Sequence, residues 1–460
     1  MNDYPKTDWQ KLITNKKLST RAKVIATLEK IHHGFSLAVL LDDLLNNVND
    51  TDKGFAHELL IGTLRQWWAL NRIGESLIEQ EVTDKGVLSA VNIGIYQLIY
   101  MHTPDYASIN DTVEAVKQLD KGYGAGLVNA ILRKVAKNPA KFAKKVQKNH
   151  SLPNHLAKIL KQDWAEYYEE LGQSLRKSAP IFLRVNAKFC TMQKYSELLN
   201  AQNITHDIVK TGVGEHTAIR LIDNLKISNL PHFSDGWLSV QDLHAQICGG
   251  ILADFVLPKL SKNINILDAC TAPGGKLAQL LEMFHVEQFN EFQPKITALD
   301  NDENRLKRVH DNLNRLQLTN DNTQIICADG VTFKSDKPYN MVILDAPCTA
   351  TGVIRRHPDI CLLRKQNDIE STINLQLQIL QNLWQSVAQN GYLLYITCSL
   401  IKAENVAQIE HFLNKNTDVQ VVDFEFNLPN QIKQTIGYQC LPIDENGGDG
   451  FYYALLQKLN

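Results

Sequence analysis

The sequence lacks several features that mark other classes of protein. None of its eight cysteines forms a CxxC pair, so they predict neither a disulfide framework nor a zinc ribbon. Its longest apolar-rich stretch, residues 89–101, is interrupted by polar side chains and is too short to cross a bilayer. No apolar segment follows the first charges, as a secretory signal requires. We therefore expect a cytoplasmic protein with reduced thiols, no membrane partner and no bound metal.

The sequence also has little net charge, −2 at pH 7, which by itself does not suggest a nucleic-acid partner. The distribution of charge is less even. Residues 133–148 contain seven Lys or Arg and no acid, beginning with Arg133 and Lys134. Such a cluster suits a phosphate backbone. A solvated linker face would explain the run alone equally well.

At 460 residues the chain is long enough for two or three domains. Residues 1–140 carry apolar side chains at helical spacing, which predicts an all-helical domain. Within it, Asp111 and Glu114 have the spacing of a capping box at the start of a helix. Residues 141–178 indicate a basic linker with short helices, and residues 179–250 indicate a small α/β domain.

Residues 251–460 alternate apolar strand-like runs with helical ones, which predicts a parallel sheet covered on both faces. The expected strands are 263–269, 295–300, 323–329, 339–346 and 391–398. Polar side chains stand at their carboxyl ends: Asp268, Asp300, Asp329, Asp345 and Cys398. Ligands bind at that edge of an open parallel sheet. A single Asp there is also common simply because a turn begins, so the prediction of a site depends on the whole set.

A glycine-containing turn follows the first of these strands. It consists of Cys270, Thr271, Ala272, Pro273, Gly274, Gly275 and Lys276. The two glycines let a ligand approach the backbone, and the helix that follows favours an electron-rich group at its N-terminus. The turn has neither the P-loop nor the GxGxxG pattern. Asp300 could accept ribose hydroxyls and Asp329 an adenine amino group, so we predict an adenosyl ligand without phosphates, such as S-adenosyl-L-methionine.

Three motifs, DACTAPGGK, LDAPCTATGVIRRHPD and YITCS, resemble in this order the RNA cytosine-carbon-5 methyltransferases of the Nop2/Sun/Fmu family. The segment SINDTVEAVKQ…GLVNAILRK resembles the NusB-type RNA-binding domain. The resemblance implies a Rossmann-like, S-adenosylmethionine-dependent domain preceded by a small α/β domain and a NusB-like domain. It also implies a monomer that methylates one cytosine of 16S ribosomal RNA. A tRNA substrate, or an inactive RNA-binding assembly factor, would be the alternatives.

The resemblance also assigns roles to two thiols that spacing alone does not distinguish. In this chemistry a thiolate adds to carbon 6 of cytosine and thereby activates carbon 5. The family pattern implies that Cys398 is the nucleophile and that Cys348 assists product release. Asp345, which also borders the cofactor, would bond the cytosine N3/N4 edge, and Lys276 would contribute charge. The residues implied to contact RNA are Arg184, Arg355, Arg356, His357, Arg133 and Lys134.

Some positions depart from the family pattern. Thr271 and Thr349 stand where smaller residues such as Ala and Ser are usual, and Cys361-Leu362-Leu363 stands where a Lys-Trp pair often occurs. Five cysteines outside the motifs are interpreted as packing residues: Cys190, Cys248, Cys327, Cys361 and Cys440.

Overall fold

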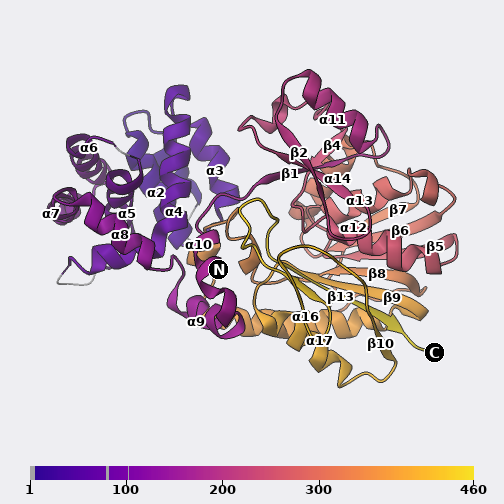
Figure 1. The fold of residues 1–460 in the computed structure, drawn as a ribbon. Coiled ribbons are helices and arrows are strands. Elements are labelled where there is room, and N and C mark those ends of the chain that lie inside the picture. The colour runs from indigo at the N-terminus through magenta and orange to yellow at the C-terminus, as the bar shows by residue number, and fades with distance from the viewer. Residues whose placement is uncertain (1–5, 79–81, 102) are drawn as a thin grey trace. The chain divides into compact units, whose positions relative to one another are not determined.

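The structure is a computed structural model that describes residues 6–78, 82–101 and 103–460. The chain divides into two compact units (Figure 1). Unit 1 comprises Met1–Ser178 and Ile354–Gln366, and unit 2 comprises Ala179–Val353 and Asn367–Asn460. The second piece of unit 1 therefore comes from residues 251–460, which were predicted to form the parallel-sheet domain.

Unit 1 is helical, as the apolar periodicity predicts. Its α-helices are α1 (Lys6–Thr14), α2 (Thr20–His32), α3 (Leu37–Asn46), α4 (Lys53–Glu75), α5 (Lys85–Tyr100), α6 (Asp105–Gln118), α7 (Ala125–Ala136), α8 (Pro139–Lys148), α9 (Asn154–Asp163), α10 (Tyr168–Ser174) and α15 (Ile360–Leu363). The predicted capping box at Asp111 and Glu114 is wrong. Helix α6 begins directly after Pro104, whose fixed φ suits a helix start, so both acids lie inside the helix.

Residues 354–366 are held in unit 1 by apolar packing and by hydrogen bonds. Leu362 and Leu363 pack against the main apolar core of the unit. The backbone N–H of Leu37, at the start of α3, donates to Asp359 (2.8 Å). A carboxylate at this helix end is favoured by the helix dipole. The indole N–H of Trp68 donates to the carbonyl oxygen of Cys361 (3.0 Å).

Unit 2 begins with the small α/β domain that the sequence predicts. Its four-stranded antiparallel sheet has the order β2-β3-β1-β4. The elements are β1 (Ile181–Val185), α11 (Met192–Ala201), β2 (His206–Lys210), β3 (Thr217–Leu221) and β4 (Leu238–Val240). Leu183, Tyr195 and Ile219 are fully buried in its core, which places α11 against one face of the sheet.

A nine-stranded sheet forms the rest of unit 2. Its main path has the order β11-β12-β13-β9-β8-β5-β6-β7, and β10 pairs with β13. The strands are β5 (Asn263–Ala269), β6 (Gln293–Asp300), β7 (Thr323–Cys327), β8 (Tyr339–Asp345), β9 (Val387–Thr397), β10 (Val419–Val422), β11 (Gln431–Lys433), β12 (Tyr438–Cys440) and β13 (Phe451–Lys458). Strands β5 to β9 pair in parallel, as predicted, and β13 pairs antiparallel with β9. Strand β7 ends two residues before Asp329, so that acid lies in the following turn.

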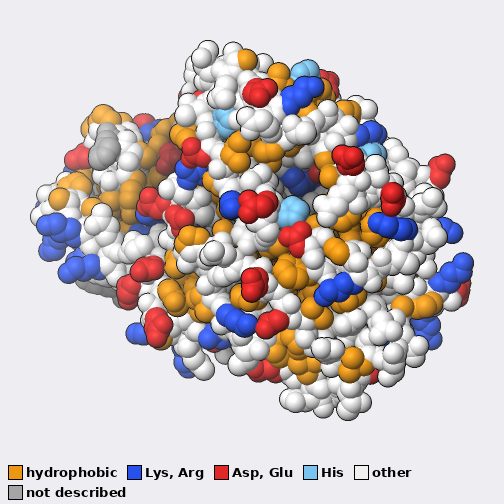
Figure 2. Space-filling view, turned by 45° about the vertical axis from the view of Figure 1, so that its right-hand side comes forward, with side chains coloured by type: hydrophobic (Ala, Val, Ile, Leu, Met, Phe, Trp, Pro, Cys, Tyr) orange, Lys and Arg blue, Asp and Glu red, His pale blue; other side chains and the backbone are white. Residues whose placement is uncertain are grey.

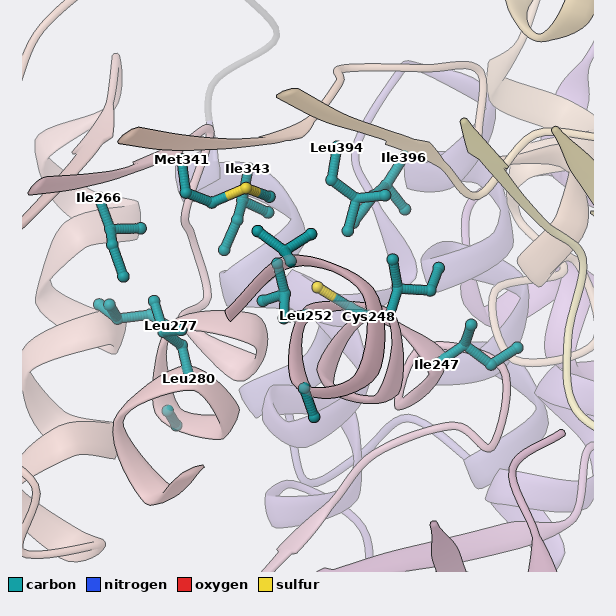
Figure 3. Close-up of a cluster of buried hydrophobic side chains, with 14 of the residues drawn as sticks. Ile247, Cys248, Leu252, Ile266, Leu277, Leu280, Met341, Ile343, Leu394 and Ile396 are labelled. Atoms are coloured by element: carbon teal, nitrogen blue, oxygen red, sulfur yellow. The ribbon is translucent and has the colours of Figure 1, made fainter. Parts of the chain in front are cut away.

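Helices cover both faces of this sheet (Figure 1). They are α12 (Ile247–Ile251), α13 (Gly275–Met283), α14 (Glu303–Arg315), α16 (Gln366–Trp384) and α17 (Val406–Leu413). Alternate strand residues face opposite sides. Ile343 and Leu394 join Cys248 and Leu277 in one apolar core (Figure 3), whereas their neighbour Leu344 packs in the other. Burial on both faces explains why the strands are continuous apolar runs.

None of the helices in the described part of the chain is long and apolar enough to span a membrane. On the face shown in Figure 2, Lys and Arg side chains are interspersed with Asp and Glu. This mixture agrees with the small net charge.

Candidate active site

The glycine-containing turn lies where strand β5 gives way to helix α13. Cys270 has φ +59° and Gly274 has φ +92°, a conformation that L side chains rarely adopt. The amide of Thr271 donates to the carbonyl of Leu299 on the neighbouring strand β6 (2.9 Å), and the amide of Gly274 donates to the carbonyl of Thr271 (2.7 Å). Ala272, Pro273 and Gly275 complete the turn, and Lys276 enters the helix. Hydrogen bonds of its own backbone therefore attach the turn to the sheet.

Acids lie around this turn in three different settings. Asp300 is buried and accepts from the amide of Ala272 (3.2 Å) and from Arg305 (3.2 Å). Asp329 is exposed and accepts from a turn amide. Asp268 is fully buried. Thr271 donates to one of its carboxylate oxygens, and the other has no hydrogen-bond partner among the described residues. Burial raises the pKa of Asp268 to about 7. The hydroxyl of Thr271, which an alanine would lack, thus donates a hydrogen bond to the buried acid at the start of the turn.

The two motif cysteines lie together. Their sulfurs, Sγ of Cys348 and Sγ of Cys398, are 3.4 Å apart, and both residues are half-buried free thiols. Strand register explains this approach. Strands β8 and β9 are parallel neighbours with Asp345 opposite Ile396, so the loops that leave their carboxyl ends start side by side. The amide of Ala346 continues the pairing by donating to the carbonyl of Ile396 (2.8 Å).

Backbone hydrogen bonds join the two loops that carry the thiols. The amide of Gly352 donates to the carbonyl of Cys398 (2.9 Å), and the amide of Gly450 donates to the carbonyl of Gly352 (2.9 Å). A Cβ atom on Gly352 would lie 2.2 Å from the carbonyl oxygen of Gly450. Only glycine permits this approach, so Gly352 fixes the position of one loop against the other.

Buried polar side chains support the same loops from beneath. Glu404 is fully buried, and its carboxylate accepts from the amide of Thr349 (2.8 Å), from the Thr349 hydroxyl (2.5 Å) and from the hydroxyl of Ser399 (3.0 Å). Asn405 donates to the carbonyl of Ser399 (2.9 Å) and accepts from Thr397 (2.5 Å). Because an ionised carboxylate is costly to bury without donors, these contacts fix the loop geometry. They also give the hydroxyl of Thr349 a role that alanine could not fill.

Lys276 and Asp345 form an ion pair at the same edge of the sheet. The distance from Nζ of Lys276 to Oδ2 of Asp345 is 2.6 Å, and the Lys276 side chain is only 11% exposed. Burial lowers the pKa of Lys276, but the charge and hydrogen bond of Asp345 outweigh it, and Cys398 adds to the upward shift. The net pKa of Lys276 is raised, so its ammonium keeps its positive charge beside Asp345 at neutral pH.

The two thiols have different surroundings. The pKa of Cys348 is raised well above the ordinary value of a thiol. The causes are its hydrogen bond with Cys398, its burial and the nearby carboxylate of Glu404. Cys348 is therefore a neutral thiol at neutral pH and can donate to the sulfur of Cys398. Burial raises the pKa of Cys270 to about 12, which makes that thiol unsuitable as a nucleophile.

Two of the side chains predicted to contact RNA, those of Arg184 and Arg355, are buried in the structure. Arg184 is buried; its guanidinium binds both carboxylate oxygens of Glu282 (2.7 and 2.9 Å) and donates to the carbonyl of Gly275 (2.9 Å). It therefore braces the start of α13 and cannot reach a phosphate. Arg355 is also fully buried. Arg356 is half-buried and His357 is exposed.

The predicted basic run remains accessible. Arg133 and Lys134 are exposed in the last turn of α7. Among the cysteines interpreted as packing residues, Cys327 is exposed, because β7 is the edge strand and the residue is its last. The other four are buried: Cys190, Cys248, Cys361 and Cys440.

Sequence reasoning missed the residues that position the site rather than line it. Arg305, Glu282, Glu404 and Asn405 lie outside the recognised motifs, on helices or turns that look ordinary in the sequence. The single available signal was Glu404-Asn405, a polar pair shortly after Cys398 and directly before an apolar helix.

Comparisons with known proteins agree with this architecture. Residues 256–457 match the family model described as 16S rRNA methyltransferase RsmB/F, residues 18–137 match the NusB family, and residues 152–227 match the RsmF/B-like ferredoxin-like domain. Ribosomal RNA small subunit methyltransferase B of Pasteurella multocida is 36% identical over 98% of this chain and 99% of its own. The protein of the same name from Vibrio cholerae is 34% identical over 96% of this chain and 98% of its own.

Solved structures share the fold. The crystal structure of PH0851 superposes with a TM-score of 0.75 at 19% identity, over 96% of this chain and 99% of that one. The crystal structure of NSun6 from Pyrococcus horikoshii with SFG has a TM-score of 0.55 at 18% identity, over 67% of this chain and 98% of that one. The family resemblance inferred from the three motifs is thus confirmed, and the chain belongs to the 16S rRNA methyltransferase RsmB/F family.

Proposed function

We propose that this chain transfers a methyl group from S-adenosyl-L-methionine to carbon 5 of one cytosine in 16S ribosomal RNA, with Cys398 as the nucleophile. The observation that carries the proposal is the thiol pair. Two free sulfurs lie 3.4 Å apart at the carboxyl ends of adjacent parallel strands, beside the buried ion pair of Lys276 and Asp345. A second thiol so close to the first can donate a hydrogen bond to the sulfur that must first bond to the ring and later leave it.

The residues around the turn fit an adenosyl-sulfonium ligand. Helix α13 has no side-chain cap, so the N–H groups of its first turn can bind the carboxylate of the ligand. Asp300 and Asp329 are the acids that would hold the ribose and the adenine. The remaining predicted cofactor contacts are those of the turn from Cys270 to Lys276 and of Asp345. When bound, S-adenosyl-L-methionine supplies an electrophilic methyl group.

The first step assigned to the chain is thiolate addition. The sulfur of Cys398 bonds to carbon 6, and the electron pair of the carbon 5–carbon 6 double bond becomes available at carbon 5 for the methyl group. Negative charge develops on the pyrimidine ring as the bond forms. Asp345 would hydrogen-bond the amino edge of the cytosine, and the ammonium of Lys276 would offset the ring charge. The target base must leave its stack, because neither carbon is accessible in a packed helix.

The second step assigned to the chain is release. Carbon 5 loses its proton to a base, the double bond re-forms, and the electron pair of the carbon 6–sulfur bond returns to Cys398. The thiol of Cys348 is 3.4 Å from that sulfur and can donate a hydrogen bond to the departing thiolate. The backbone hydrogen bonds of Gly352 and the contacts of the buried Glu404 carboxylate keep the two sulfurs at this separation.

The proposal is tested by incubating 16S rRNA with methyl-labelled cofactor and single-cysteine variants. Cys398→Ala should transfer no methyl group and form no protein–RNA adduct. Cys348→Ala should accumulate an adduct that survives denaturing electrophoresis and disappears after nuclease treatment. Cys327→Ala, an exposed thiol on another strand, is the matched control and should behave as the wild type. Exchanged phenotypes of the first two variants would reverse the assignment.

The same assay separates the alternatives. Methylation of tRNA but not of 16S rRNA would change the substrate and leave the chemistry intact. An inactive assembly factor would fail to bind the cofactor and would form no adduct with either RNA.

A further inference from the structure

The two thiols of the proposed reaction are also close enough to bond to each other. Their sulfurs, Sγ of Cys348 and Sγ of Cys398, are 3.4 Å apart, and both residues are free thiols. A disulfide needs a sulfur–sulfur distance of about 2.05 Å. The two sulfurs would have to approach by about 1.4 Å, which rotation of two short side chains can supply.

Hydrogen bonds hold the backbone on both sides of this pair. The carbonyl of Cys398 accepts from the amide of Gly352 (2.9 Å), and the amide of Thr349 donates to the buried Glu404 (2.8 Å). The two loops start from strands β8 and β9, which are parallel neighbours. The sulfurs can therefore meet while these strands stay paired, as an unstrained disulfide requires.

A small oxidant can reach the pair, because Cys348 and Cys398 are both half-buried. Four other cysteines are buried: Cys190, Cys248, Cys361 and Cys440. Cys327 is exposed on an edge strand, and burial raises the pKa of Cys270 to about 12, which keeps that thiol protonated and slow to react. An accessible thiol and a second sulfur within reach thus occur together at Cys348 and Cys398.

We propose that Cys348 and Cys398 form a reversible disulfide when the protein meets a peroxide, and that this bond stops methyl transfer. The inference rests on the proposed function in one respect, because the loss of methylation requires Cys398 to be the nucleophile. It gives Cys348 a second role, which is to resolve the oxidised form of its neighbour. Transient disulfides of this kind act as redox sensors in reducing compartments.

The reaction proceeds in two balanced steps. The sulfur of Cys398 attacks one oxygen of the peroxide, so that a sulfur–oxygen bond forms, the oxygen–oxygen bond breaks, and water leaves. The sulfur of Cys348 then attacks the sulfur of Cys398. The sulfur–sulfur bond forms, the sulfur–oxygen bond breaks, and the departing oxygen takes the proton of Cys348 and leaves as a second water. The two thiols together lose two electrons and two protons, and a dithiol returns them.

Cys348 also protects its neighbour in this scheme. Without a second thiol within reach, the sulfenic acid of Cys398 meets more peroxide and becomes a sulfinic acid, which thiol reductants do not reverse. With Cys348 in place, the disulfide forms first and the nucleophile can be recovered.

The test treats the wild type, Cys348→Ser and Cys327→Ser with hydrogen peroxide in the absence of RNA. After alkylation of free thiols and protease digestion, mass spectrometry identifies the state of each cysteine. The wild type should yield the peptides of Cys348 and Cys398 joined, with the mass of two hydrogen atoms lost, and dithiothreitol should separate them. Cys348→Ser should yield Cys398 as sulfinic acid. Cys327→Ser, which removes the exposed thiol, is the matched control and should behave as the wild type.

Two measurements connect the bond to function. Methyl transfer to 16S rRNA by the wild type should fall in proportion to the joined fraction and should return with dithiothreitol. The affinity for S-adenosyl-L-homocysteine, measured by calorimetry, should be unchanged in the oxidised protein, because the glycine-containing turn lies between β5 and α13 and not on the joined loops. Circular dichroism of each variant before oxidation confirms that it is folded.

The proposal is overturned if peroxide oxidises Cys398 without joining it to Cys348, or joins it to Cys270 or to a second chain. Equal formation of sulfinic acid in the wild type and in Cys348→Ser would also overturn it. If no joined peptide forms while the reduced protein still makes its RNA adduct, this inference ends and the proposed function stands. If the reduced wild type makes no RNA adduct, the proposed function ends, and with it the effect on methyl transfer.

Discussion

Replacing Arg184 by alanine should destabilise unit 2 by about 3–5 kcal/mol, the usual cost of leaving a buried charge unpaired. The side chains of Arg184 and Glu282 are only 7% and 4% exposed, and two hydrogen bonds join them. Burial raises the pKa of Glu282, and Arg184 opposes that rise. Without the guanidinium, Arg315 alone opposes the effect of burial, so the pKa of Glu282 rises further. Since Arg184 also donates to Gly275 (2.9 Å), the start of α13 loses a brace and cofactor affinity should fall.

The assay is urea unfolding followed by circular dichroism, together with calorimetry of cofactor binding. The double variant Arg184→Met/Glu282→Leu should recover much of the lost stability, because it removes both buried charges. Lys433→Ala, which breaks an exposed pair with Asp423, should have no measurable effect. If Arg184→Ala unfolds at the same urea concentration as Lys433→Ala, the reasoning from burial is refuted.

The remaining predictions concern buried polar groups. Because burial raises the folded pKa of Asp268 to about 7, the folded state binds the proton more tightly than the unfolded chain. The unfolding free energy should therefore fall as the pH rises from about 4 to 7, and Asp268→Asn should flatten that dependence; an unchanged profile would contradict it. Thr349→Val leaves Glu404 without one donor and should cost about 1–3 kcal/mol in urea unfolding, whereas Thr349→Ser should cost less; equal losses would count against the hydroxyl. Trp68→Phe keeps a ring but removes the hydrogen bond to Cys361 and should cost about 1 kcal/mol; no shift in melting temperature would contradict that contact.

The fold of unit 2 could be predicted because its strands are continuous apolar runs buried on two faces. The ends of the strands were predicted less accurately than the strands themselves. Asp329 was expected to end a strand, but β7 stops at Cys327 and the acid belongs to the next turn. Edge strands have one neighbour, so their pattern ends less sharply than that of a central strand such as β8.

Residues that line a turn or follow a strand could be found from the sequence, since their position follows from topology. The turn from Cys270 to Lys276 and the approach of Cys348 to Cys398 are of this kind. The partners of buried charged side chains could not be predicted from the sequence. Arg184 meets Glu282 at a separation of 98 positions, which no local pattern records, and so the arginine was taken for an RNA contact.

The assignment of residues 354–366 to unit 1 also could not be read from the sequence. The segment lies between two motif-bearing strands, and its HPD motif suggested a substrate contact. In the structure Asp359 binds the backbone N–H of Leu37, and Leu362 and Leu363 pack into the helical core. The departure from the family pattern at Cys361-Leu362-Leu363 therefore lies within unit 1.

The central claim is that the sulfur of Cys398 bonds to the target ring. RNA substrate in which the cytosines are replaced by 5-fluorocytosine should trap this bond, because carbon 5 then has no proton to lose and release stops. After nuclease and protease digestion, mass spectrometry of the wild-type protein locates the nucleotide on one peptide. The account predicts a methylated fluorocytosine adduct on the peptide that contains Cys398; an adduct on Cys348, or none while unmodified RNA is methylated, would contradict it.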